Sequence, residues 1–230
     1  MDQAFLLRGV MNLVPLLLSL TVHEFAHAWS AYRLGDDTAR RLGRLSLNPL
    51  VHADLIGTIL LPFLMALIPG GILFGWAKPV PVDPSRFRRG IRMSTGMMLT
   101  AAAGPLANVV LAVVLTMTLA LLARFAPGVL DGDSGLRVLL VGGTIGGGSF
   151  EGLIALNVVL AIFNLIPVPP LDGSRIVHGL LPYRMRPAWD GLTRFTPLLL
   201  VGVFVYGGRL VNGPAHLMLS ILQRLFDAIV

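Results

Sequence analysis

The hydrophobic residues of this chain lie in long runs that are separated by short polar, arginine-bearing stretches. A transmembrane helix needs about 20 mostly apolar residues, and several of the runs reach that length. The sequence therefore predicts an all-α polytopic membrane protein, a helical bundle of about 5–6 transmembrane segments. The apolar runs behind this prediction cover residues 5–34, 55–76, 93–124, 150–166 and 195–230.

The composition strengthens this prediction and excludes other classes of protein. Of the 230 residues, 55% are hydrophobic and 13% are charged, and the mean hydropathy is +0.78, whereas soluble domains carry roughly 25% charged residues. Because the chain has no cysteine, it forms neither disulfides nor thiolate metal sites. The net charge of +6 comes almost entirely from arginine. In so apolar a chain this charge indicates membrane topology and does not argue for nucleic acid.

A polar cluster interrupts the first apolar run. The sequence HEFAH at residues 23–27 is an HExxH motif. On a helix, residues i and i+4 lie on one face, so His23 and His27 can bind one zinc ion. Glu24 lies beside that face, placed to take a proton from a metal-bound water whose pKa falls to ~7. The alternative is a set of buried polar residues that pair between helices, although ionisable groups within membrane segments are costly and usually functional.

A catalytic zinc needs a third protein ligand besides two histidines. Asp172 stands out because the prolines of FNLIPVPPLDG must end the helix before it. The irregular backbone is then free to turn the carboxylate inward, toward protein or a cavity. The alternative reading is a turn aspartate before glycine, which is a common pattern. The other candidates for the third ligand are His52, Asp54, Glu151, His178 and His216.

Three motifs in order resemble the site-2 protease family of intramembrane zinc metalloproteases. They are HEFAH near the end of the first predicted helix, AAAGPLANVV in a later one and NLIPVPPLDG at the end of a third. The stretches GRLSLNPLVHADLIGTILLP and GWAKPVPVDP resemble the compact branch of the family, which lacks PDZ and CBS domains. The resemblance covers about residues 17–175.

The resemblance implies a role for each matching residue. His23, His27 and Asp172 would bind one Zn²⁺ per chain, and Glu24 would act as general base and then as general acid to the leaving amine. Asn108, the last residue of GPLAN, would donate a hydrogen bond to the substrate carbonyl or the oxyanion. The alternative for Asn108 is an interhelical hydrogen bond. We expect Gly104 and Pro105 to allow close packing and a local kink beside the site.

The shared zinc constrains the topology. The end of the first helix and the end of the helix before Asp172 must lie on the same side of the bilayer, and both adjoining loops are rich in arginine. The positive-inside rule makes that side cytoplasmic. Because the basic loop 77–92 lies there too, the chain must cross an even number of times between Leu34 and Met93. We therefore expect residues 55–76 to form a re-entrant or hairpin segment that turns near Pro69-Gly70-Gly71.

The stretch WAKPVPV at residues 76–82 cannot be helical, because its prolines and their neighbours favour extended backbone. We expect a short extended edge strand there. Its residues Lys78, Pro79 and Val80 could pair with an unwound substrate segment by β-augmentation, and the alternative is a structural loop against the headgroups. His52 and Asp54 are expected to be interfacial polar residues.

These observations predict an intramembrane zinc endopeptidase that cleaves transmembrane segments of membrane proteins. We expect one membrane domain over residues 1–230, with its catalytic core at about 5–175 and a transmembrane tail at about 195–230. Its partners would be a substrate with a transmembrane helix and the lipid bilayer of a bacterial or archaeal cell membrane, with the active site towards the cytoplasm. The alternative is a non-catalytic metal-binding membrane protein or transporter, which has no need of Glu24.

Overall fold

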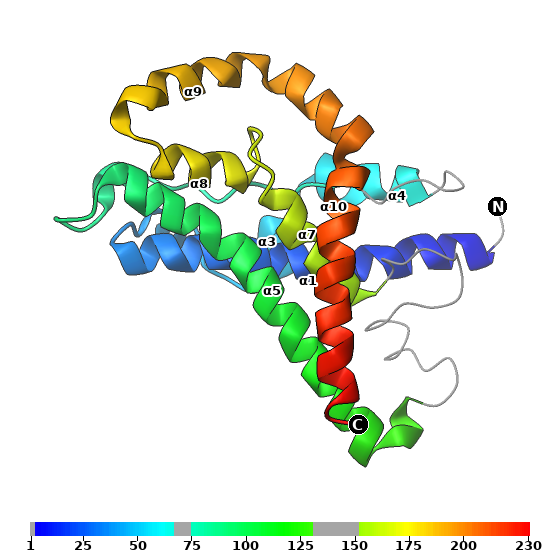
Figure 1. The fold of residues 1–230 in the computed structure, drawn as a ribbon. Helices are drawn as coiled ribbons and strands as arrows, with labels where there is room; N and C mark the ends of the chain where they lie inside the picture. Colours follow the sequence, from blue (N-terminus) through cyan, green and yellow to red (C-terminus); the bar gives the residue numbers. More distant parts are fainter. Residues whose placement is uncertain (1–2, 67–74, 131–151) are drawn as a thin grey trace.

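A computed structural model describes residues 3–66, 75–130 and 152–230 (Figure 1), and these residues are largely helical. The principal helices are α1 (Gln3–Leu34), α5 (Met93–Phe125), α7 (Leu153–Asn164), α8 (Asp172–Leu180) and α10 (Thr196–Asp227). Short helices α2 (Thr38–Arg41), α3 (Pro49–His52), α4 (Leu61–Ala66) and α9 (Arg186–Leu192) lie between them, and a π-helical turn covers Leu55–Leu60. The all-α prediction is confirmed for these residues.

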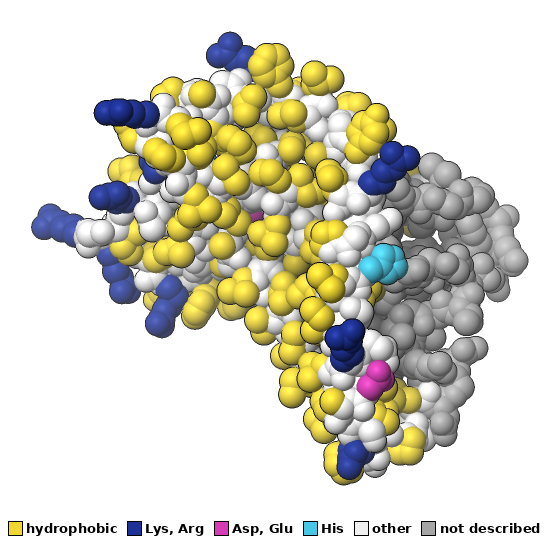
Figure 2. All heavy atoms as spheres, viewed as in Figure 1, with side chains coloured by type: hydrophobic (Ala, Val, Ile, Leu, Met, Phe, Trp, Pro, Cys, Tyr) yellow, Lys and Arg dark blue, Asp and Glu magenta, His cyan; other side chains and the backbone are white. Residues whose placement is uncertain are grey.

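Two of the described helices have the length and composition of membrane spans. One is Met93–Phe125, and the other is the helical stretch within Tyr183–Asp227. Only 22% and 17% of their most apolar windows are buried, so their apolar side chains mostly face outward, as in a helix that faces lipid. Figure 2 shows apolar side chains over most of one face of the molecule. The total of 5–6 transmembrane segments stays a prediction.

Helix α5 lies at the centre of the bundle and contacts α1, α7, α8 and α10. Its buried face is made of small residues, which let neighbouring backbones approach closely. Between α5, α7 and α10 lies an apolar cluster of Ala112, Val158, Val211, Ala215 and Leu222. The small buried residues of α5 include Gly96, Thr100, Ala101, Gly104, Ala112, Thr116 and Ala120.

The connection between α7 and α8 brings the predicted third ligand into the bundle. Helix α7 ends at Asn164, and a short non-helical stretch with a cis Pro169-Pro170 bond leads to Asp172. Asp172 is the first residue of α8. The sequence predicted that the helix would end before this aspartate, which is correct, but it did not predict that a new helix begins there.

Hydrogen bonds join the two ends of the predicted hairpin segment, residues 55–76. The N–H of Trp76 donates to the carbonyl of Gly57 (3.0 Å), and the hydroxyl of Thr58 donates to the carbonyl of Trp76 (2.6 Å). The N–H of Lys78 donates to the carbonyl of His52 (2.9 Å). The predicted turn at residues 69–71 lies outside the described residues.

The predicted edge strand is not assigned as a strand in the described part of the chain. Residues 75–83 are extended and non-helical, as predicted. A strand is defined by a hydrogen-bonded ladder with a neighbour, and main-chain groups here bond other partners. The guanidinium of Arg44 donates to the carbonyls of Lys78 and Pro79, and the N–H of Val80 donates to the Glu24 carboxylate. The segment is thus a single extended strand-like stretch.

The loop that follows this segment lies against the end of α1. The N–H of Asp83 donates to the buried carboxylate of Asp36 (2.7 Å), and the N–H of Arg88 donates to the carbonyl of Leu34 (2.8 Å). The two basic loops therefore lie side by side.

This contact generates a labelling prediction. Single cysteines introduced as Leu42→Cys and Arg89→Cys lie on exposed positions of the two loops, and the native chain contributes no thiol of its own. In oriented vesicles, a membrane-impermeant maleimide should label both cysteines from the same side. Labelling of the two positions from opposite sides would contradict the fold.

Candidate metal centre

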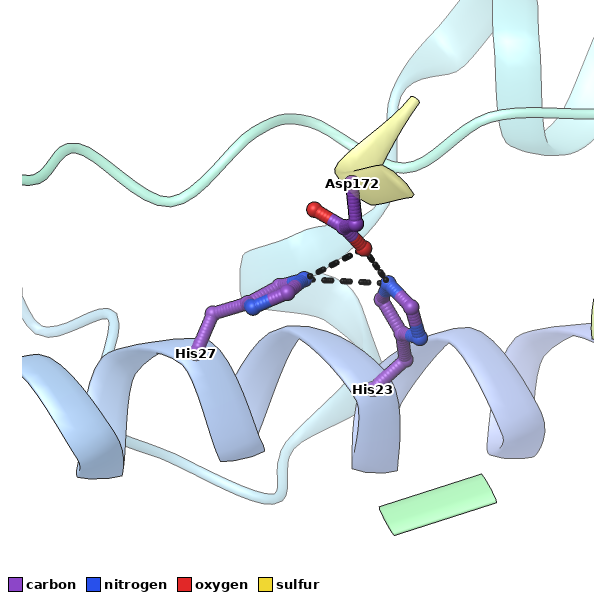
Figure 3. Close-up of side chains that lie close together, drawn as sticks. All are labelled: His23, His27 and Asp172. Atoms are coloured by element: carbon purple, nitrogen blue, oxygen red, sulfur yellow. Dashed lines mark hydrogen bonds and ion pairs between the residues drawn. The ribbon is translucent and has the colours of Figure 1, made fainter. Parts of the chain in front are cut away.

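Three side chains from two helices meet inside the bundle. His23 and His27 lie one turn apart on α1, with ring centroids 4.6 Å apart and planes nearly perpendicular. Asp172, at the start of α8, points at the gap between the two rings (Figure 3). All three residues are buried, with 4%, 8% and 7% of their surfaces exposed. His23 and Asp172 are far apart in the sequence. They meet because α5 and α7 pack against α1, and α8 packs against α5.

The atoms that face one another are all potential metal ligands. Asp172 Oδ2 lies 3.1 Å from His23 Nε2 and 3.2 Å from His27 Nε2, and the two Nε2 atoms are 3.0 Å apart. Histidine nitrogens and carboxylate oxygens are zinc ligands. Among the described residues, these three form the group that brings one ligand atom each to within 4.8 Å of the others.

The hydrogen bonds behind the rings test whether a metal fits. His27 Nδ1 lies 2.7 Å from the carbonyl oxygen of Thr100, and His23 Nδ1 lies 2.6 Å from Asn108 Oδ1. A carbonyl oxygen only accepts, so Nδ1 carries the hydrogen in each neutral ring and Nε2 carries a lone pair. Three lone-pair atoms then converge on one buried point, where they repel each other unless a cation lies between them. The donor set therefore fits a divalent metal with nitrogen and oxygen preferences.

Two glycines make room for this arrangement. A Cβ atom on Gly104 of α5 would lie 2.5 Å from Cε1 and Nε2 of His27 and 2.6 Å from Cε1 of His23. A Cβ on Gly173 would collide with the carbonyl oxygens of Leu165 and Ile166 at the end of α7. The close packing predicted at Gly104 is confirmed, and Gly173 allows Asp172 to sit directly against the end of α7.

Glu24 lies beside the metal-ligand group but does not belong to it. Its side chain is half-buried, and Oε2 accepts a hydrogen bond from the N–H of Val80 (3.1 Å). One residue along an α-helix rotates the side chain by about 100°, so Glu24 points away from the face of His23 and reaches the extended segment instead. The structure thus places the Glu24 carboxylate against Val80 and outside the group of His23, His27 and Asp172.

Asn108 is hydrogen-bonded to three other residues of the bundle. It is fully buried, its Oδ1 accepts from His23 Nδ1, and its Nδ2 donates to Asn157 Oδ1 (2.6 Å) and to the carbonyl of Ser19 (3.3 Å). Every hydrogen-bonding group of the amide is engaged within the protein. The interhelical hydrogen bond named as the alternative is therefore present, and the bond from Asn108 to a substrate stays a prediction.

The other candidate ligands lie elsewhere or outside the described residues. His52 is buried and bonds the carbonyl of Ser46 through Nε2 (2.7 Å), so it takes no part in the group of His23, His27 and Asp172. Asp54 accepts from the N–H groups of Ile56 and Gly57 and thereby caps the turn that follows it. His178 lies 3.4 Å from Asp190. His216 is on α10, and Glu151 is not among the described residues.

Sequence reasoning missed the residues that hold the histidines in place. Thr100 acts through its main-chain carbonyl, which leaves no side-chain signal in the sequence. Asn157 did leave a signal, because an amide in the apolar run LIALNVVLAIF is costly unless it is hydrogen-bonded. Ser19, about one helical turn before His23, bonds Asn157 and carries the carbonyl that Asn108 contacts.

Comparisons with known proteins agree with this site. The family model for peptidase family M50 matches residues 147–196, which include Asp172. "Putative zinc metalloprotease YwhC" of Bacillus subtilis is 41% identical over 192 residues, which are 84% of this chain and 78% of that protein. "Putative zinc metalloprotease Rip2" is 33% identical in Mycolicibacterium smegmatis (74% of this chain, 56% of that protein) and 30% identical in Mycobacterium tuberculosis (85% and 67%).

No solved structure matches the chain. The relationship to YwhC, which extends over most of both chains, decides the family. The three ordered motifs, the buried His23–His27–Asp172 group and these relatives agree: the chain belongs to peptidase family M50, the site-2 protease family.

Proposed function

We propose that this protein is an intramembrane zinc endopeptidase, which hydrolyses peptide bonds within the transmembrane segments of other membrane proteins. The observation that carries the proposal is the convergence of three buried ligand atoms beside a carboxylate that does not join them. His23 Nε2, His27 Nε2 and Asp172 Oδ2 would hold one zinc ion, which is the cofactor named for the relatives. Regulated intramembrane proteolysis is the process that such a site serves.

Each residue of the site has a separate task in this proposal. Bound zinc supplies a Lewis acid that polarises a carbonyl oxygen and makes water more acidic. Glu24 takes the proton from the attacking water and later delivers it to the leaving amine. Asn108 positions His23, because its Oδ1 accepts a hydrogen bond from Nδ1 of that ring.

The extended segment at Lys78, Pro79 and Val80 would hold the substrate. A transmembrane helix must unwind before its peptide bonds can be cleaved, and an unwound strand can pair with an exposed extended segment. This segment lies beside the proposed base, since the N–H of Val80 bonds Glu24. A substrate strand that pairs at Val80 would take over this N–H and release the carboxylate for catalysis.

The proposed location is the cell membrane, with the active site towards the cytoplasm. The basic residues of the loops after α1 and before α5 lie together, because Asp83 and Arg88 bond the end of α1. The positive-inside rule favours the cytoplasm for this side. Residues 5–175 would form the catalytic core and residues 195–230 a transmembrane tail, all within one domain of 1–230.

Glu24→Gln separates catalysis from metal binding. The purified variant should retain one zinc per chain, because Glu24 is not among the ligand atoms, while cleavage of a transmembrane model substrate should fall by about 10²–10⁴-fold. Zinc content by mass spectrometry and product formation in detergent micelles check both. Full cleavage by Glu24→Gln would refute the role of Glu24 as the base. A wild-type protein that binds zinc and cleaves nothing would favour the metal-binding protein or transporter instead.

Gly104→Ala should weaken the metal site without touching a ligand. The added methyl group would press on both histidine rings, so we expect zinc affinity to fall by about 10–100-fold, as when a supporting group of a metal site is altered. Competition with a chromogenic chelator measures this affinity. Gly202→Ala, on α10 with open space around it, is the matched control and should bind zinc like the wild type. Equal affinity of the two variants would argue against a metal between these rings.

A photo-crosslinking amino acid at Val80 tests the substrate-binding segment. In a Glu24→Gln background, which keeps the substrate uncleaved, it should crosslink to a transmembrane model substrate. The same amino acid at Arg89, which is exposed on the neighbouring loop, should give little product. Equal crosslinking at both positions would refute binding at residues 78–80 while leaving the zinc proposal intact.

A further inference from the structure

Three polar side chains lie together behind His23, in surroundings that are otherwise apolar. Ser19 on α1, Asn108 on α5 and Asn157 on α7 are fully buried, with 0% of each residue exposed. Each comes from a different helix of the central bundle. Buried polar groups cost free energy unless they are hydrogen-bonded, so the bonds among these residues define what the cluster can do.

The main-chain carbonyl of Leu153 determines which group donates and which accepts in each of these hydrogen bonds. Asn157 Nδ2 donates to the main-chain carbonyl of Leu153 (2.7 Å) and to Ser19 Oγ (2.9 Å). A carbonyl oxygen cannot donate, so Leu153 compels Asn157 to turn its NH₂ group towards its own helix. The amide oxygen of Asn157 must then face the other way, towards Asn108.

The orientation of Asn157 determines that of Asn108, which bonds the metal-site residue His23. Asn108 donates through Nδ2 to Asn157 Oδ1 (2.6 Å) and, at longer range, to the carbonyl of Ser19 (3.3 Å). Its Oδ1 is therefore directed at His23 Nδ1, 2.6 Å away. Because an amide oxygen only accepts, the hydrogen of the neutral His23 ring must sit on Nδ1, and the lone pair must sit on Nε2, which faces His27 and Asp172.

We propose that Asn157 is a positioning residue of this enzyme, which acts through Asn108 to keep His23 in its metal-binding tautomer. The inference rests on the proposed function, since it assigns the Nε2 lone pair to zinc. If Asn108 turned its NH₂ group towards His23, Nδ1 would have to accept, and the ring hydrogen would move to Nε2. His23 would then present an N–H to the metal site in place of a lone pair.

The second histidine provides a contrast within the same site. His27 Nδ1 bonds the main-chain carbonyl of Thr100 directly, and a carbonyl cannot be reversed by rotation of a side chain. Its tautomer needs no relay. Loss of Asn157 should therefore affect His23 and spare His27, which a general loss of packing would not do.

The experiment compares Asn157→Leu with Thr116→Val in the full-length protein. Leucine has nearly the shape of asparagine but can neither donate to Leu153 nor accept from Asn108. Thr116 is buried on α5, and its hydroxyl bonds only its own helix, at Ala112 (2.8 Å). Zinc affinity, measured by competition with a chelator, should fall by about 10–100-fold in Asn157→Leu and should stay unchanged in Thr116→Val.

A second readout follows the tautomer itself. In metal-free protein with ¹⁵N-labelled histidine, NMR distinguishes a ring with hydrogen on Nδ1 from one with hydrogen on Nε2, and a His23→Gln variant identifies the His23 signals. Asn157→Leu should convert part of the His23 population to the Nε2–H form and leave His27 unchanged. Asn157→Thr is the substitute if the leucine variant does not fold. Its hydroxyl can bond the carbonyl of Leu153, as Thr116 bonds Ala112, so it disturbs the helix less. The same shift of His23 towards the Nε2–H form is expected.

The outcomes separate this inference from the proposed function. Wild-type zinc affinity and an unchanged His23 tautomer in the folded Asn157 variants would overturn the positioning role while leaving the peptidase proposal standing. A wild-type protein that binds no zinc would refute the proposed function itself. An equal disturbance of His23 and His27 would show that Asn157 serves packing alone and would also overturn the inference.

Discussion

The meeting of Asp172 with His23 and His27 is the contact on which the rest of this structure depends. It buries a carboxylate and two imidazoles in an apolar bundle, where each polar group costs several kcal/mol unless it is compensated. The ligand atoms lie about one hydrogen-bond length from each other, so the helices that carry them must be held to a fraction of that distance. Helix α1 cannot do this alone, because Asp172 arrives on a different helix.

The fit of α5 against α1 makes that precision attainable. In lipid there is no hydrophobic driving force between helices, so association depends on close packing and on hydrogen bonds. The buried face of α5 supplies both. Its glycines and alanines allow near contact, with Gly104 lying directly against the histidine rings. Thr100 and Asn108, one turn to either side of Gly104, bond the outer nitrogens of His27 and His23. One helix face therefore packs against the ligands and also orients them.

The sequence was sufficient for the parts of this design that repeat with a helical period or sit in a motif. The HEFAH spacing predicted the two histidines on one face, the prolines before Asp172 predicted the end of a helix, and the glycine of GPLAN predicted close packing.

Contacts made by main-chain groups could not be predicted from the sequence. The carbonyl of Thr100 carries no side-chain signature, and α8 begins at Asp172 because of tertiary packing against the end of α7, where Gly173 is required. The edge strand failed as a strand because Arg44 and Glu24, distant in sequence, occupy its main-chain groups. Asn108 bonds His23, and its partner Asn157, which was not among the predicted site residues, determines which way its amide faces.

In the proposed mechanism, Glu24 must lie next to the metal ligands without becoming one, because it acts as the base. A carboxylate one residue away from a metal ligand would coordinate the ion itself if nothing opposed it, and it would then be lost as a base. Two features oppose this. The helix turns Glu24 by about 100° from the face of His23, and the N–H of Val80 gives its Oε2 a partner on the far side. Val80 lies between two prolines, which have no N–H to offer, so it is the donor within this stretch of the extended segment that can bond the carboxylate. The segment proposed to receive the substrate is thus also the element that bonds the carboxylate of the proposed base.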